Sequence, residues 1–126
     1  MESRRVVVTG IGALTPLGNN LQDYWSSLIS GVSGAGKITH FDATHFKTQF
    51  ACELKDFNVA DHIDRKEAKK MDKFSQYAMV VAAEAVKSSK LDVESINSDR
   101  AGVIWGSGIG GMETFLKESI SFGNGN

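Results

Sequence analysis

The sequence is poor in the residues that cross-link or kink a chain, since its 126 residues include one cysteine and one proline. Cys52 alone cannot form an internal disulfide, and no CxxC pair or Cys/His cluster has the spacing of a zinc site. We therefore expect a protein of the reducing cytoplasm without a metal centre. The formal net charge is only −1, so any charged partner has to be bound by a local patch rather than by an overall field.

Long apolar runs are also missing. The stretch 77–86 is interrupted by Glu84 and is much shorter than the roughly 18 apolar residues of a membrane-spanning helix. The apolar run Val6–Val8 is followed at once by Thr9 and Gly10, too soon for the hydrophobic part of a signal peptide. We expect neither a membrane span nor a secretion signal.

The composition that is present is typical of a folded globular chain. Hydrophobic residues make up 41% and charged residues 23%, which excludes disordered and fibrous classes. Two apolar segments, residues 5–9 and 101–105, predict strands buried on both faces of a parallel sheet. Weaker strand character over 46–54 lies inside an excursion of about residues 32–63. Two parallel strands are few for an open α/β sheet, so we expect the first portion of a larger fold.

Apolar residues at steps of three and four predict helices. The expected ranges are about 21–30, 64–89 with a break near 71–72, and 112–122. Asn20 and Asp64 are placed to cap the first two helices, and Gly31 and Gly123 are placed to end the first and the last.

A row of lysines marks one face of the second predicted helix. Its members are Lys66, Lys69, Lys70 and Lys73. A solvated helix face is one interpretation of this row, and a docking strip for an acidic partner is the other.

Two glycine-rich turns suggest nucleotide binding. The first, from Gly10, lacks the third glycine of G-x-G-x-x-G because Thr15 stands there. Gly106, Gly108 and Gly111 satisfy the pattern between a predicted strand and a predicted helix. A lone match is weak evidence, since glycine also permits a close turn beside other ligands. A nicotinamide- or flavin-dependent oxidoreductase is therefore one alternative.

No catalytic constellation is complete in this sequence. Cys52 lies in a strand-like context, without the glycine elbow or helix N-terminus that makes a cysteine reactive. His40, His45 and His62 are isolated from acids and cysteines at catalytic spacing, so we interpret them as surface or loop residues. We identify no catalytic residue and no metal ligand in this chain.

The sequence resembles the β-ketoacyl-acyl carrier protein synthases along essentially its whole length. The matching segments are RRVVVTGIG at 4–12, TPLGN at 15–19, HFD at 40–42, KDF at 55–57, RKE at 65–67, KMD at 70–72 and GSGIGG at 106–111. They occur in the family's order and spacing. With isoleucine in its glycine segment, the sequence most resembles the type II elongating synthases of bacterial fatty acid synthesis.

This resemblance implies a thiolase-like fold of two α/β halves in five αβαβα layers, assembled as a homodimer. In the family a cysteine takes the acyl group from acyl carrier protein, and two histidines assist decarboxylation of malonyl-acyl carrier protein and the Claisen condensation. None of the three maps onto residues 1–126, so we expect an incomplete amino-terminal portion, inactive alone and without a cofactor. The noncatalytic alternative is a ketosynthase-like partner that has lost its cysteine.

Two family sites map onto this sequence. The resemblance places carrier-protein docking at Lys66, Lys69 and Lys70, which suits an acidic carrier. It places the acyl-chain pocket at Ile109, with Gly108 beside it, which suits a bulky apolar residue among glycines. The implied partner is acyl carrier protein in its acyl- and malonyl-loaded forms, with no nucleic acid and no membrane.

Overall fold

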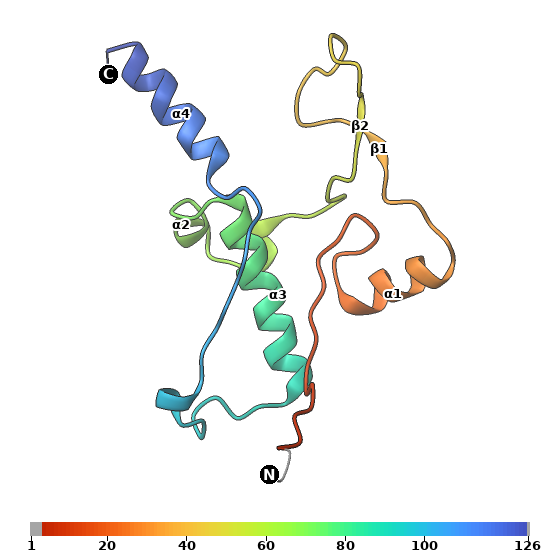
Figure 1. Ribbon diagram of the computed structural model, residues 1–126, viewed down its shortest axis with the longest axis vertical. Coiled ribbons are helices and arrows are strands. Elements are labelled where there is room, and N and C mark those ends of the chain that lie inside the picture. The colour runs from red at the N-terminus through yellow and green to blue at the C-terminus, as the bar shows by residue number, and fades with distance from the viewer. Residues whose placement is uncertain (1–3, 126) are drawn as a thin grey trace. The chain divides into compact units, whose positions relative to one another are not determined.

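The computed structural model describes residues 4–125, which divide into two compact units. Unit 1 consists of Met1–Phe57 and Val81–Lys90, and unit 2 of Asn58–Val80 and Leu91–Asn126. The elements in chain order are α1 (Leu21–Ile29), β1 (Gly36–Lys37), β2 (Phe50–Ala51), η1 (Val59–Asp61), α2 (Arg65–Ala68), α3 (Lys73–Ser89), η2 (Ser98–Arg100) and α4 (Met112–Gly123), as Figure 1 shows. The first part of α3 belongs to unit 2 and the remainder to unit 1.

Local signals set the helix ends where the sequence predicts them. The side chain of Asn20 accepts a hydrogen bond of 2.9 Å from the backbone N–H of Asp23 and so caps α1. Gly31 follows α1 with a φ of +68°, in the left-handed region that glycine adopts without strain. The helix predicted over 112–122 is α4, and it ends at Gly123. The predicted break in the second helix is also confirmed, because α2 and α3 are separate helices.

Two glycines of the first turn lie against α3 in unit 1. A β-carbon on Gly10 would stand 2.2 Å from the carbonyl oxygen of Ala85, and one on Gly12 would stand 2.2 Å from that of Val81. Only glycine permits this approach. The carboxylate of Glu84 fixes the same segment, since its oxygens accept the backbone N–H groups of Ala13 at 2.7 Å and Leu21 at 2.9 Å. These glycines therefore serve helix packing.

A short hairpin occupies the predicted excursion. Strands β1 and β2 pair antiparallel, with Gly36 opposite Ala51 and Lys37 opposite Phe50. Part of the strand character predicted for 46–54 is thus confirmed. Within residues 4–125 this pair is the only sheet.

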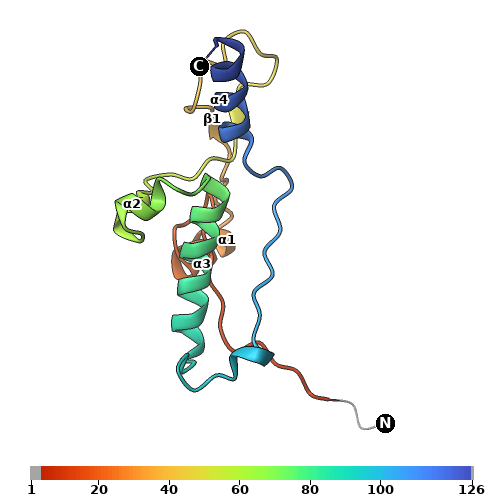
Figure 2. The ribbon, with the colours of Figure 1, turned by 90° about the vertical axis from the view of Figure 1, so that its left-hand side faces the viewer.

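The prediction of two parallel strands is wrong for the described residues. Residues 5–9 and 101–105 form no strand, and both run as irregular chain (Figures 1 and 2). Val6 is 85% exposed and Ile104 is 99% exposed. A strand exists only through hydrogen bonds to a neighbouring strand, and the described residues supply none here. The buried hydrophobic residues are correspondingly few: Ala43, Ala68 and Val80.

Candidate functional site

The short helix α2 carries the first of the predicted docking lysines. Asp64 begins α2, because its Oδ1 accepts backbone N–H groups of Lys66 at 2.8 Å and Glu67 at 3.3 Å. Ala68, 5% exposed, is the one buried residue of α2. Its burial leaves the lysines of the same segment at the surface.

Gln76 holds the turn between α2 and α3. Its Nε2 donates to the carbonyl oxygens of Ala68 at 2.8 Å and Met71 at 3.1 Å. These carbonyls lie at and just after the end of α2, where the Ala68 carbonyl also accepts the backbone N–H of Met71 at 3.2 Å. The lysine row therefore does not lie on one continuous helix face as the sequence predicts: Lys66 is in α2, Lys69 and Lys70 are in the turn, and Lys73 begins α3.

The predicted docking lysines differ in how far their charge is compensated. Lys66 and Lys69 are exposed, and neither forms an ion pair with any residue between 4 and 125. Lys70 is also exposed, but its Nζ lies 2.7 Å from Oε1 of Glu67. The structure thus brings the three lysines together at the end of α2 and leaves two of them uncompensated.

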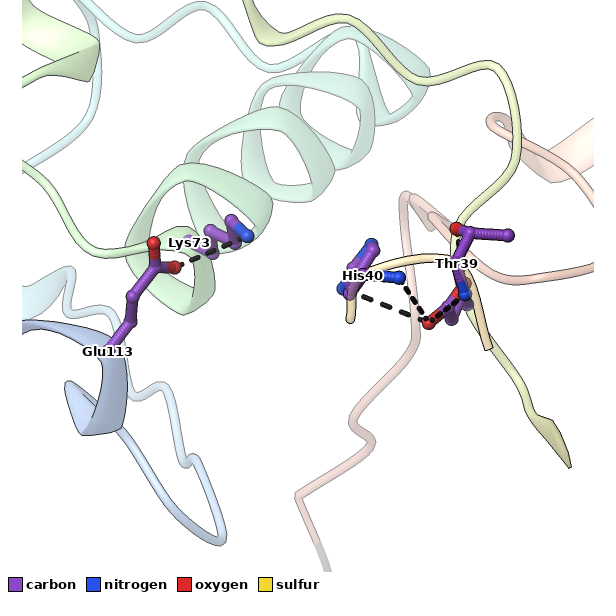
Figure 3. Close-up of polar contacts among 5 residues, drawn as sticks. Thr39, His40, Lys73 and Glu113 are labelled. Carbon is purple, nitrogen blue, oxygen red and sulfur yellow. Dashed lines mark hydrogen bonds and ion pairs between the residues drawn. The ribbon is translucent and has the colours of Figure 1, made fainter. Parts of the chain in front are cut away.

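Lys73 is engaged in a separate network with α4. Its Nζ lies 3.2 Å from Oε2 of Glu113 (Figure 3). Lys117 Nζ lies 3.0 Å from Oε1 of the same carboxylate. Hydrogen bonds from Lys117 and then Lys73 lower the pKa of Glu113. Lys73 is therefore not a free member of the cationic row. The i,i+4 spacing of Glu113 and Lys117 is a sequence signal for their own pair but not for the contact with Lys73.

A hollow of about 250 Å³ lies at this junction within unit 2. Residues from the turn, α3 and α4 line it, among them Lys69, Asp72, Lys73, Glu113, Thr114 and Lys117. Glu113 is paired with Lys73 and Lys117. Lys69 and Asp72 line the same hollow without an ion pair among the described residues.

The glycine segment before α4 has a free part and an anchored part. A β-carbon on Gly106 or Gly108 would meet no atom within 4 Å, and Ile109 is 76% exposed. Gly110, in contrast, lies against the ring of Phe74, because a β-carbon on Gly110 would stand 3.1 Å from Cε1 of that ring. Gly111 has a φ of +64° and immediately precedes α4. Ile109 and Gly108 thus lie at the surface of the described residues, directly before a fixed turn.

The strand required before a dinucleotide-binding glycine loop is absent from this part of the structure. Residues 101–105 are irregular, and α4 begins only after Gly111. The strand–turn–helix context that gives the G-x-G-x-x-G pattern its meaning is therefore not formed among the described residues.

Of the remaining candidates, Cys52, His40 and His45 lie in unit 1 and His62 lies in unit 2. Cys52 is exposed and forms no disulfide. His40 Nδ1 lies 3.9 Å from Oε1 of Glu53, and Oε2 of the same carboxylate accepts the hydroxyl of Thr39 (Figure 3). Among residues 4–125 no group of three or more His, Cys, Asp or Glu side chains could hold a metal ion. Nor does any helix in that range have the length and apolar character to cross a membrane.

Curated relatives of this chain are bacterial 3-oxoacyl-acyl-carrier-protein synthases. The 3-oxoacyl-acyl-carrier-protein synthase 2 of Staphylococcus aureus (strain COL) is 53% identical over 114 residues, which cover 90% of this chain and 28% of the relative. The enzyme of the same description from Synechocystis sp. is 48% identical over 113 residues, or 90% of this chain and 27% of the relative. The chain therefore spans about a quarter of the length of these relatives.

Solved ketosynthase structures match the fold. One is a type II polyketide synthase acyl-carrier protein in complex with its ketosynthase bound to the hexaketide, with a TM-score of 0.60 and 32% identity over 78% of this chain and 24% of that one. Another is the ishigamide ketosynthase/chain length factor, with a TM-score of 0.67 and 35% identity over 74% and 23%. Residues 3–124 match the family described as "Beta-ketoacyl synthase, N-terminal domain". This chain belongs to the β-ketoacyl synthase family, of which it contains the N-terminal domain match.

Proposed function

We propose that these residues are the amino-terminal portion of a 3-oxoacyl-acyl-carrier-protein synthase of the type II elongating kind. That enzyme joins an acyl group to malonyl-acyl carrier protein, forming a carbon–carbon bond with loss of carbon dioxide. The catalytic cysteine and two histidines lie outside residues 1–126. The whole enzyme is a cytoplasmic, cofactor-free homodimer with the αβαβα fold. The 53% identity to the Staphylococcus aureus synthase is the observation that carries this proposal.

The role we assign to the end of α2 is docking of acyl carrier protein. Lys66 and Lys69 present two positive charges that no acid among residues 4–125 neutralises. Exposed charges of this kind speed the encounter with an oppositely charged partner and add little to a long-lived complex. A carrier protein has to arrive, deliver its acyl group and leave, so such a surface suits it.

The role we assign to the glycine segment is recognition of the acyl chain. Ile109 offers an apolar side chain between glycines, and Gly108 leaves the space beside it open. A side chain in this position lines a hydrocarbon channel once other parts of the enzyme cover it. The pocket wall is therefore Ile109, with Gly108 as the adjoining position.

Charge reversal tests the docking role. In the full-length enzyme, we expect Lys66→Glu with Lys69→Glu to weaken binding of acyl carrier protein about tenfold at low salt and to flatten its salt dependence, because screening sets in within about 10 Å at 0.1 M salt. Activity toward small thioesters without the carrier protein changes far less. Binding is measured by titration, and turnover is measured with both substrate types.

The matched control is Lys47→Glu, an exposed lysine of unit 1 without an ion pair in the described residues. This variant makes the same charge reversal at a site away from α2, so we expect its affinity for acyl carrier protein to stay near that of the parent enzyme. Equal losses with carrier-bound and carrier-free substrates would contradict docking and assign the two lysines to folding. Unchanged binding would favour a merely solvated helix face.

A further inference from the structure

Asp72 combines a local role and a long-range contact. Its backbone carbonyl accepts the N–H groups of Ser75 and Gln76, each at 3.0 Å, and so begins α3. An aspartate in this position usually caps its own helix with its side chain. Here the carboxylate oxygen Oδ1 instead accepts the hydroxyl of Thr114, a residue 42 positions later in the first turn of α4.

The same carboxylate lies against the turn that leads into α4. A β-carbon on Gly111 would stand 3.2 Å from Asp72 Oδ2. Gly111 precedes α4 without a side chain of its own to cap the helix. A half-buried carboxylate at this end stabilises α4 because it faces the positive end of the helix dipole.

Residues beside Asp72 reinforce this junction. Gly110 lies against the ring of Phe74, which is in the first turn of α3, two residues after Asp72. The ion pair between Lys73 and Glu113 connects the same two helix ends, although its partners are about half exposed and contribute little on their own. The last two glycines of the segment are therefore fixed to the first turn of α3, and Ile109 is the next residue toward the N-terminus.

We propose that Asp72 is a positioning residue for acyl-chain selection. Through Thr114 and Gly111 it holds the turn at 110–111, and this turn determines where the side chain of Ile109 stands. The proposal rests on the acyl-pocket role given to Ile109 above. It also places the residue that positions the pocket wall immediately after the segment carrying the docking lysines.

The test compares primers of different length in the full-length enzyme. Thr114→Val removes the hydroxyl with little change of shape, and Asp72→Asn removes the charge while keeping an acceptor. We expect each to change the ratio of kcat/KM for long over short acyl primers by about tenfold, the size of one hydrogen bond to a charged group. The double variant should change it no further than the larger single effect, since both remove one interaction. Thr114→Ser, which keeps the hydroxyl, should retain the parent's ratio.

The matched control is Thr44→Val. Thr44 donates its hydroxyl to Asp42 at 2.8 Å, the same chemistry in an exposed loop of unit 1, so its loss leaves the ratio unchanged. A lowered melting temperature with an unchanged ratio in Thr114→Val and Asp72→Asn would overturn the proposal, as would a Thr114→Ser enzyme that behaves like Thr114→Val. If Thr114→Val does not fold, Asp72→Asn carries the same comparison.

An Ile109→Phe arm separates this proposal from the proposed function. If Ile109→Phe changes the length profile and the Asp72 and Thr114 variants do not, the positioning role is wrong and the pocket role stands. If none of the three changes the profile, the pocket role itself is wrong, and the positioning role with it.

Discussion

Glu67 controls how much positive charge the end of α2 presents. Its carboxylate lies 2.7 Å from Lys70 Nζ, with both side chains more than half exposed. An exposed pair of this kind contributes about 0–1 kcal/mol to stability, so folding does not depend on it. The pair has a larger effect on the attraction of a negatively charged partner, because Glu67 cancels the charge of one of the three docking lysines.

Removing the Glu67 charge should therefore tighten carrier docking. In the full-length enzyme we expect Glu67→Gln to strengthen binding of acyl carrier protein about two- to fivefold at low salt, with an unchanged melting temperature. Titrations at two salt concentrations measure the effect. The control is Glu94→Gln, which removes an exposed carboxylate of unit 2 that has no ion pair among residues 4–125. Weaker binding in Glu67→Gln would show that Glu67 orients Lys70 and does not oppose it.

Enlarging Ile109 tests the acyl pocket at one residue. If Ile109 lines a hydrocarbon channel, Ile109→Phe blocks its deeper part, so short primers are still elongated and long primers fail. Each buried methylene contributes roughly 0.8 kcal/mol, and excluding about four of them removes about 3 kcal/mol of binding to the longer primer. The selectivity then shifts by about a hundredfold. Primer-length profiles and melting temperatures of variant and parent measure it.

The exposure of Ile109 sharpens that comparison. Because the side chain is 76% exposed, a larger ring meets no close packing among the described residues. Overpacking in a closed core typically costs about 1–3 kcal/mol of stability with every substrate. A lowered melting temperature with an unchanged length profile would therefore show that Ile109 is a core residue of the whole enzyme and not a pocket wall.

At the scale of elements, one carboxylate adds side-chain bonds between the segments that follow β1 and β2. Glu53 accepts the hydroxyl of Thr39 at 2.7 Å and the backbone N–H of Thr39 at 3.0 Å. The hydroxyl bond is the main reason that its pKa is lowered below the usual 4.5. A lowered carboxyl pKa contributes stability above the unfolded value, and this contribution is lost as the pH falls through the folded value.

The hairpin should accordingly loosen in acid below pH 4.5. We expect amide hydrogen exchange around Thr39, corrected for intrinsic rates, to show decreasing protection in that range, since a protonated carboxyl is a weaker acceptor. Glu53→Gln should remove this pH dependence, because its amide does not titrate. Asp42→Asn is the control, since it neutralises another carboxyl of the same loop whose pKa is lowered by Thr44. Protection around Thr39 with the same pH profile in parent and Glu53→Gln would contradict the role of Glu53.

The helices could be predicted because their signals are local. Asn20 and Asp64 cap helices within three residues of themselves, and Gly31 ends α1 in the conformation that glycine favours. The state of residues 5–9 and 101–105 could not be predicted in the same way, because a β-ladder depends on partner strands that an apolar sequence does not specify. The contact of Asp72 with Thr114 spans 42 positions, and no periodicity connects residues so far apart.

The candidate site divides in the same way. Helical spacing predicts the lysine row, and the family resemblance predicts docking at Lys66, Lys69 and Lys70. The structure places these three lysines on a short helix and a turn. That turn depends on Gln76, whose side chain bonds to two carbonyls, and a single amide in a helical sequence gives no signal of such a role. The compensation of Lys73 by Glu113 likewise required the structure.

At the scale of the whole molecule, the exposed apolar surface is large. Besides Val6 and Ile104, it includes Val8 at 80% and Val103 at 88% exposure, and Phe122 of α4 at 85%. Apolar surface of this extent normally marks places where other protein covers it. Covering protein of this kind would also supply the neighbouring strands without which residues 5–9 and 101–105 form no ladder.

The isolated 126-residue chain should therefore associate and should have no condensing activity. Association follows because segments of high β-propensity, such as Val6–Val8, are available to pair with other copies. Inactivity follows because nucleophilic catalysis requires an activated nucleophile, which we place outside these residues. Sedimentation across a concentration series measures the first, and elongation of acyl-acyl carrier protein measures the second.

Val7→Lys with Val103→Lys, which puts charge on both segments, should shift the chain toward monomer, whereas Lys47→Glu should not. A monomeric parent with a cooperative unfolding transition would contradict the first expectation, and elongation by the purified chain would contradict the second.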